Sequence, residues 1–454
     1  MGDRRIVIGA GPDALRAAAV LAHGGHQVTL LQEASTLHGV DHPEIPLGTG
    51  RIRVSAEGRA VAEEVLGALV EAPDLMRGVV KGGKICRLPL SPWQVGQYLD
   101  GAQRLPAFRE WARRRSRNRM HDLLGGGQEE RTYRDWVERR MGGPAFEHLY
   151  RAWAENRWGA SAENLSVTIA RSVHGKPDVD SKTVAGGGPE VSYKVCQRLI
   201  EDAGGHIITG AKVTRLVIEQ VEKDLRVVAV EHSDGRIPVA DPRADQVWVA
   251  RSPRVVAGWL GDQLDGSLHF DAEELICRDL LQVTMRGETD GLPEELHVLD
   301  HGAPFYRAVT PYGHEKTIVF HSSLGRDQAT PPHGELVDRF SRAAEALGIG
   351  RFGTAAGQPA DSVLVQRVVG WHPVWTQGTH SRYRRVMLNW QDIGLVGVGR
   401  AGSFTPMDPG EEVQLGLLYR DEARPNQHEV HRALLDPPVM LDDLFSSSTR
   451  LMER

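Results

Sequence analysis

The first residues whose types and spacing suit chemistry form a glycine-rich segment near the start of the chain, Gly9-Ala10-Gly11-Pro12-Asp13-Ala14. It follows the apolar run 6–8 and precedes an alanine-rich, helix-forming run. In this pattern Gly9 permits a tight turn, Gly11 lets the backbone approach a pyrophosphate, and the small Ala14 lets helix and strand pack closely. The start of the helix offers N–H groups and a partial positive charge. The segment therefore predicts a phosphate site of a dinucleotide.

Glu33 lies at the position where a dinucleotide site needs an acidic residue. A second strand is expected at 27–31, and it ends in Gln32 and Glu33. Glu33 lies roughly 20 residues past the glycine turn, where an acid accepts hydrogen bonds from a ribose hydroxyl. Strand, turn, helix, strand and acid together form a βαβ unit that predicts nucleotide binding. A helix entrance without any ligand is the alternative interpretation.

A second glycine-rich segment lies at 394–417, far along the chain. It reads as a short apolar strand, a glycine turn and a helix opened by Pro409, with Glu411 and Glu412 in the first turn. The first unit alone does not separate NAD from FAD. FAD is long, and a second helix aimed at the isoalloxazine by its N-terminus stabilises negative charge on the reduced flavin. The late element therefore favours FAD.

No motif for a protein nucleophile or a metal is present. G-x-S-x-G, H-E-x-x-H and clustered Cys/His are all missing from the sequence, and this fits chemistry carried by a cofactor. The composition, 41% hydrophobic and 25% charged, is that of a globular protein, and no apolar run reaches the roughly 18–20 residues of a membrane-spanning helix. The three cysteines, Cys86, Cys196 and Cys277, are too widely spaced for a disulfide framework. We expect a reducing, cytoplasmic location.

The net charge of −6 gives no case for a nucleic-acid partner. One basic run is the exception: Arg113, Arg114, Arg115, Arg117 and Arg119. It is either a solvated helix face or the edge of a site for an anionic substrate or an acidic lipid surface. We therefore expect a small-molecule substrate, anionic on the second interpretation, and membrane contact that is peripheral at most.

Nine further segments along the chain are informative because of the order in which they occur. They are Glu33-Ala34-Ser35, Leu47-Gly48-Thr49-Gly50, 84–91, 146–159 with 163–166, 186–188, 212–217, Pro304-Phe305-Tyr306-Arg307, 371–375, and Gly397-Val398-Gly399-Arg400 with Met407-Asp408. In this order they resemble the motifs of the FAD-dependent amine oxidase/protoporphyrinogen oxidase superfamily, and within it the branch near UDP-galactopyranose mutase.

The resemblance implies which residues hold FAD and which face the substrate. The cofactor set is Gly9, Gly11, Pro12, Asp13, Ala14, Glu33, Ala34, Gly39, Gly48, Thr49, Val213, Gly399, Arg400, Met407 and Asp408. The catalytic set is His372, Arg307, Tyr306 and Trp375. Arg307 or Arg400 can hold a carboxylate or phosphate in bidentate fashion, and His372 can act as an acid or base with a pKa near working pH. Core packing is the alternative for the aromatic side chains and for His372.

The sequence departs from the family just after the acid. The family usually has Gly-Gly-Arg there, whereas this chain has His38-Gly39-Val40. Only the second glycine is kept, and the cation that would meet a phosphate is lost. A descendant that has lost its flavin is therefore an alternative.

The resemblance implies an α/β fold, with a Rossmann-like FAD/NAD(P)-binding domain interleaved with a mixed α+β substrate domain. Residues 1–80, 185–258 and 376–420 are expected in the first domain, and 81–184 and 259–375 in the second. The tail, 421–454, docks on its own chain or on a partner. Within the substrate domain, 92–170 is helix-biased, while 281–286 and 316–322 are strand-like.

The leading functional prediction is an FAD-dependent oxidoreductase that takes a hydride from a small-molecule substrate. Two alternatives stay open. One is a non-redox flavoenzyme similar to the UDP-sugar mutase, and the other is a non-catalytic nucleotide-binding or scaffold protein.

Overall fold

The computed structural model describes residues 4–35, 51–54, 59–73, 75–88, 90, 92–124, 130–174, 182–186, 189–243, 245–287, 291–314, 316–352 and 363–405. Several sequence predictions lie outside these residues. They concern His38, Gly39 and Val40, the cofactor positions Gly48, Thr49, Met407 and Asp408, the helix expected at Pro409, and the tail 421–454.

A parallel sheet of five strands carries the first glycine turn. Its strands are β1 (Arg4–Gly9), β2 (Gln27–Gln32), β8 (His206–Thr209), β12 (Val247–Ala250) and β18 (Leu395–Gly397). They lie side by side in the order β18-β12-β1-β2-β8, and every neighbouring pair is parallel. This is the strand order of a Rossmann-like sheet, in which the chain reverses direction across the sheet beside β1. The predicted fold class is confirmed.

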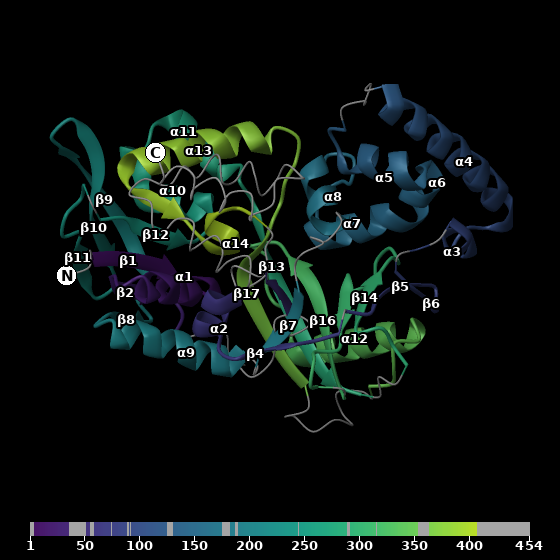
Figure 1. Ribbon diagram of the computed structural model, residues 1–454, viewed down its shortest axis with the longest axis horizontal. Helices are drawn as coiled ribbons and strands as arrows, with labels where there is room; N and C mark the ends of the chain where they lie inside the picture. The colour runs from purple at the N-terminus through teal and green to yellow at the C-terminus, as the bar shows by residue number, and fades with distance from the viewer. Residues whose placement is uncertain are drawn as a thin grey trace.

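Helices cover both faces of this sheet, which explains why its strands are apolar throughout. On one face Val7 packs with α1 (Pro12–His23), α2 (Arg59–Leu66) and α9 (Pro189–Asp202). On the other face Ile6 and Ile8 pack with α10 (Pro253–Leu260), α11 (Gly266–Glu273) and α13 (Thr379–Ile393). Figure 1 shows the two groups of helices on either side of β1.

A small antiparallel sheet is inserted between β8 and β12 in the chain. It consists of β9 (Val213–Val221), β10 (Asp224–His232) and β11 (Gly235–Pro238). Gln263, in the short 3₁₀ helix η2 (Gly261–Gln263), accepts a hydrogen bond from the backbone N–H of Ile218 at 2.9 Å. This contact ties the small sheet to the end of α10.

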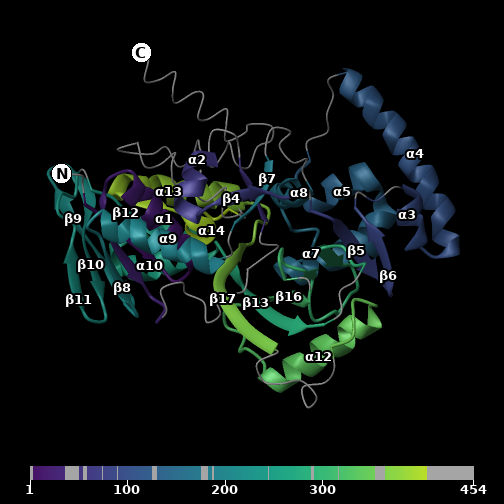
Figure 2. The ribbon, with the colours of Figure 1, turned by 60° about the horizontal axis from the view of Figure 1, so that its bottom comes forward.

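A second large sheet is mixed and has seven strands. They are β17 (Val363–Pro373), β13 (Cys277–Arg286), β16 (Thr317–Leu324), β15 (Arg307–Val309), β14 (Glu295–Val298), β5 (Arg77–Lys81) and β6 (Lys84–Arg87), in this spatial order. Only the β14–β5 pair is parallel. The strands predicted at 281–286 and 316–322 are confirmed as parts of β13 and β16. Helix α12 (His333–Ala346) covers one face of this sheet, as Figure 2 shows.

The stretch 92–170, predicted to be helical, forms a separate helical group beside the mixed sheet (Figure 1). It consists of α3 (Pro92–Gln97), α4 (Gly101–Leu124), α5 (Tyr133–Met141), α6 (Gly143–Ala145), the π-helix η1 (Phe146–Tyr150), α7 (Arg151–Trp158) and α8 (Val167–His174). A fourth sheet, of β3 (Arg51–Val54), β7 (Lys182–Gly186) and β4 (Leu69–Glu71), completes the described strands.

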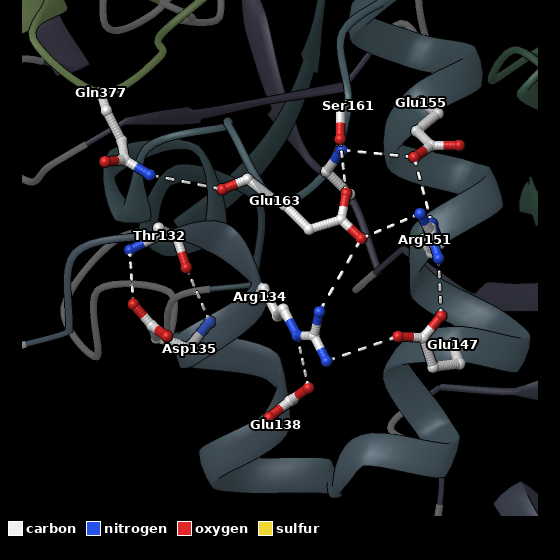
Figure 3. A network of polar contacts seen from close by, with 11 residues as sticks. Thr132, Arg134, Asp135, Glu138, Glu147, Arg151, Glu155, Ser161, Glu163 and Gln377 are labelled. Atoms are coloured by element: carbon white, nitrogen blue, oxygen red, sulfur yellow. Dashed lines mark hydrogen bonds and ion pairs between the residues drawn. The ribbon is translucent and has the colours of Figure 1, made fainter.

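Ion pairs hold the helical group together on its surface (Figure 3). The carboxylate of Glu163 lies 2.9 Å from Arg151 on α7 and 3.9 Å from Arg134 on α5. Glu147 pairs with the same two arginines, at 2.8 and 3.5 Å. The network therefore joins α5, η1 and α7, although each exposed pair adds only a few tenths of a kcal/mol.

The strands of the mixed sheet come from two stretches of the chain. In the sequence, one stretch lies between β2 and β8 and the other between β12 and β18, which are strands of the parallel sheet. The exact domain boundaries stay a prediction. Among the helices that the structure describes, none combines the length and the apolar character needed to cross a bilayer.

Candidate functional site

The first glycine turn has the geometry that its sequence predicts. A Cβ atom on Gly9 would lie 2.3 Å from the Cβ of Ala14, so glycine is required where α1 crosses β1. A Cβ on Gly11 would meet nothing within 4 Å. The backbone at Gly11 is therefore open to a ligand, at the point where Pro12 begins α1.

The two glycine-rich segments, far apart in the sequence, meet in the structure. Asp13 accepts a hydrogen bond from the backbone N–H of Arg400 at 3.0 Å and one from the Arg16 side chain at 2.9 Å. Arg400 lies in the short helix α14 (Gly399–Gly402), which is beside α1 in Figure 1. Gly399 has φ +63°, and a Cβ there would lie 2.6 Å from the Cβ of Asp13. Backbone conformation and close approach both require glycine at 399.

The other late glycines serve close packing. A Cβ on Gly402 would lie 1.9 Å from the carbonyl oxygen of Val249, and one on Gly397 would lie 2.4 Å from that of Gly402. The sequence predicts only a turn here, whereas α14 is already helical at Gly399. These glycines let α14 press onto the ends of β12 and β18.

Glu33 and Val213, two predicted cofactor residues, are brought together. The Val213 backbone N–H lies beside the Glu33 carboxylate and lowers its pKa. It also lies 2.9 Å from the Arg251 side chain, which the sequence analysis did not single out. Burial raises the pKa of Glu33, and the nearby Arg251 guanidinium opposes this rise. The carbonyl of Ala34 accepts a hydrogen bond from Gly210 at 2.8 Å, which fixes the turn after β2.

On the mixed sheet, two predicted catalytic residues form a buried pair. The Tyr306 hydroxyl lies 2.7 Å from Nε2 of His372. Burial raises the pKa of Tyr306. Burial, together with Arg157 and Arg400, lowers the pKa of His372 well below its usual value. His372 is therefore a neutral imidazole at neutral pH, in contrast to the sequence-based expectation of a group that titrates there, and its Nε2 can accept a hydrogen bond from the Tyr306 hydroxyl.

Arg307 is already engaged by a carboxylate. It lies 2.7 Å from Glu295, which also pairs with Arg77 at 3.1 Å. Burial would raise the pKa of Glu295, but Arg307, His297 and Arg77 outweigh it and hold that pKa at about 2. Burial lowers the pKa of His297 to about 4. Glu295 is therefore the charged acid of this region, and it neutralises part of the charge of Arg307 and Arg77.

Arg157 on α7 belongs to the site although the sequence analysis gave it no role. Its guanidinium lies over the rings of Trp158, Trp153 and Tyr306, at 4.7, 5.5 and 5.6 Å from their centroids. Among the described residues no carboxylate lies within ion-pair distance of it. Arg157 lies within 146–159, one of the segments that carry the resemblance to the flavoenzyme family. The segment was therefore identified from sequence, but the role of the Arg157 charge was not.

Arg400 lies beside the Tyr306–His372 pair, whereas Trp375 lies in the hydrophobic core. The Arg400 guanidinium is 3.6 Å above the ring of Trp371, close to His372. Trp375 is fully buried, donates its Nε1–H to the carbonyl of Phe404 at 2.9 Å and packs on Tyr383. No ring contact or hydrogen bond between Trp375 and the Tyr306–His372 pair is found within the described chain. Its surroundings are those of a core residue.

The predicted arginine run lies at the outer edge of the helical group, on α4, in both views of the molecule (Figures 1 and 2). The side chain of Arg113 is exposed, and the other four lie outside the described side chains. Across the described ranges, no group of three or more His, Cys, Asp or Glu side chains is placed to hold a metal ion.

A Rossmann-like parallel sheet joined to a mixed sheet defines a flavin-dependent oxidoreductase/mutase-like fold. No protein-family model matches the chain, and no curated protein matches its sequence. Solved structures do match its fold. Reduced UDP-galactopyranose mutase matches with a TM-score of 0.70 at 13% identity, over 96% of this chain and 97% of that chain.

Two further structures agree. An oxidoreductase from Methanosarcina mazei matches with a TM-score of 0.58 at 16% identity, over 92% of this chain and 99% of its own. Putrescine oxidase bound to putrescine matches with a TM-score of 0.56 at 15% identity, over 92% and 98%. The predicted resemblance to this group of flavoenzymes is therefore confirmed at the level of the fold.

Proposed function

We propose that this chain is an FAD-dependent oxidoreductase that takes a hydride from a C–H bond of a small-molecule substrate. The observation that carries the proposal is the position of Arg400. Its backbone N–H is bound by Asp13 in the first glycine turn, and its guanidinium lies over Trp371 of the mixed sheet. The predicted cofactor side and the predicted substrate side therefore meet at one residue.

The described residues fit FAD. The open backbone at Gly11 and the start of α1 would receive the pyrophosphate, with Gly9, Pro12, Asp13 and Ala14 shaping the turn. Glu33 and Val213 would hold the ribose and adenine end, and Arg251 keeps the Glu33 side chain in place. The negative charge of Asp13 is balanced by Arg16 rather than left to repel a phosphate.

A bound flavin would supply the hydride acceptor, and the chain's own residues would supply position and proton handling. Tyr306 can donate a hydrogen bond from Oη to Nε2 of His372 in a buried setting, which keeps the proton on the tyrosine and orients its hydroxyl. Arg157 can orient a negatively charged substrate group, because it has a positive charge and no described carboxylate partner. The tryptophans around it exclude water.

A visible spectrum of the purified protein, with FAD released by heat, tests the proposal. We expect flavin bands and about one FAD per chain. The matched variant is Gly11→Val. Gly11 is extended (φ −151°, ψ −177°), which suits a β-branched residue before proline, and a side chain there meets no neighbour. Gly11→Val should therefore fold, lose the flavin, and melt at the same temperature as wild-type protein from which FAD has been removed.

Two results would contradict the proposal. One is a Gly11→Val protein that keeps FAD as the wild type does. The other is a wild-type protein that is colourless and refuses added FAD, which would favour the flavin-free alternative suggested by His38 and Val40.

A mutase-like activity is the second candidate. It is supported by the TM-score of 0.70 with UDP-galactopyranose mutase, against 0.56 with putrescine oxidase. The two activities differ in their need for a reductant. An oxidase substrate bleaches the oxidised flavin under anaerobic conditions, whereas a mutase-like enzyme turns over only after the flavin has been reduced.

A further inference from the structure

A row of polar side chains crosses five strands of the mixed sheet. In the strand register, His297 of β14 pairs with Arg307 of β15, and Arg307 pairs with His321 of β16. His321 pairs with Gln282 of β13, and Gln282 pairs with Gln366 of β17. Directly paired residues lie on the same face of a sheet. All five side chains therefore belong to one face, which we call the polar row.

The residues one position along each strand belong to the opposite face, and they are all apolar. They are Leu296, Ala308, Phe320, Val283 and Val365, which are paired in the same way and pack with α12. The polar row is thus confined to the face away from α12. There Trp153 of α7 stacks edge-on against His297, with ring centroids 5.3 Å apart.

Two members of the polar row are buried without hydrogen-bond partners among the described residues. His321 is fully buried, and neither of its ring nitrogens has a partner there. Gln366 is 4% exposed, and the same holds for both polar atoms of its amide. Buried polar groups in folded proteins are nearly always satisfied by protein or by an ordered bound molecule. These two side chains therefore indicate a ligand with hydrogen-bonding groups.

The charge near the row indicates what kind of ligand it is. Burial lowers the pKa of both His321 and His372 well below the usual value, so both rings are neutral. Glu295 is shared by Arg307 and Arg77. Arg157 projects beside Tyr306 and feels the charge of Glu295, but no described carboxylate lies within ion-pair distance of it. The described residues therefore leave positive charge in a partly desolvated place, which favours an anion.

We infer that the polar row binds a small molecule that has an oxyanionic group, carboxylate or phosphate, at Arg157 and Arg307, and hydroxyl or amide groups over His321 and Gln366. Three strand spacings of about 4.8 Å separate Arg307 from Gln366, so the row suits a substrate several bonds long. As a statement of substrate class, the inference rests on the proposed function. Its binding test does not require turnover.

Calorimetric titration of the purified protein tests the inference. The probes are sorbitol 6-phosphate and D-gluconate, whose six-carbon chains suit the length of the row, with sorbitol as the neutral control. We expect at least one of the anions to bind saturably below about 10 mM and sorbitol not to bind. The anion that binds identifies the group as phosphate or carboxylate.

The informative variant is Arg157→Gln, matched by Arg151→Gln on the same helix. Arg151 is exposed and pairs with Glu147, Glu155 and Glu163, as seen in Figure 3. Both variants remove one positive charge from α7. Arg157→Gln should weaken anion binding by more than about tenfold, because it removes the direct charge partner, and Arg151→Gln by less than about twofold.

Gln366→Leu keeps the inference testable if Arg157→Gln does not fold. It should weaken the hydroxyl-bearing anion several-fold while leaving binding of inorganic phosphate unchanged. The inference is overturned if neither anion binds, or if Arg157→Gln and Arg151→Gln bind equally. The FAD content of the same sample separates the two proposals. An FAD-loaded protein that binds no anion overturns this inference alone, and a flavin-free protein that binds the anion overturns the proposed function alone.

Discussion

The two faces of the mixed sheet are built from alternate residues of the same strands. They differ in how completely their buried side chains find packing or hydrogen-bond partners. Toward α12, Phe320 packs against both Phe305 and Phe340, with ring centroids 4.6 and 6.0 Å away, in a contact made by apolar rings alone. Toward α7, His321 is equally buried, and no residue that the structure describes forms a hydrogen bond with its ring. The difference teaches that one face stabilises the fold while the other gives up stability for binding, as functional sites commonly do.

The largest effect is expected on the apolar face. Phe320→Ala removes a fully buried ring and leaves a cavity, so the free energy of unfolding should fall by about 3 to 5 kcal/mol. Urea denaturation measures this loss. The folded fraction should still bind the anionic probe within about twofold of wild type, because the Phe320 side chain packs toward α12 and away from the polar row. A large loss of binding in folded Phe320→Ala would show that the faces are coupled.

A smaller loss is expected for the carboxylate at the end of the polar row. The pKa of Glu295 is depressed from 4.5 to about 2, so its ionised form adds stability above the unfolded-state value. That contribution is lost as pH falls from about 4.5 toward 2. Glu295→Gln should lose about 3 kcal/mol at pH 7 and show a flatter acid limb. Denaturation at several pH values measures both, and an unchanged acid limb would contradict the assignment.

The smallest effect has the opposite sign. Gln366→Leu removes a buried amide that lacks partners, so the unliganded protein should become more stable by about 1 kcal/mol. The melting temperature measures the change. The same variant should bind the hydroxyl-bearing anion more weakly, and this pairing of gained stability with lost affinity is the clearest sign that the polar row is a site. A destabilised Gln366→Leu protein would place Gln366 in the structural core instead.

The parts of the structure that sequence predicts well are local. The turn at Gly9 and Gly11, the strand before it and Glu33 after β2 all follow from neighbouring residues, and the strands at 281–286 and 316–322 follow from their composition. The polar row could not be predicted, because it depends on register between strands that lie far apart in the chain. His321 stands within a predicted strand, but nothing local pairs it with Gln282 or Arg307.

The same reason explains other features that the sequence analysis missed. The contact of Arg251 with Glu33 and the role of Arg157 depend on how separate elements meet. The glycines at 397 and 402 were attributed to a turn, whereas the backbone of Val249 sets the space available for Gly402. Signals for ligand chemistry were present in the sequence, and signals for tertiary packing were not.

The hydrogen bond between Asp13 and Arg400 has a consequence for biosynthesis. It joins residues 387 positions apart. At translation rates of roughly 5 to 20 residues per second, the first helix waits roughly 20 to 80 s before its partner leaves the ribosome. In the later part of that interval β12 has been synthesised but lacks its neighbour β18, so it presents an unpaired edge to other nascent chains. The predicted cofactor turn is thus among the first segments to be synthesised and among the last to be completed, so slow or interrupted translation should favour aggregation of this chain.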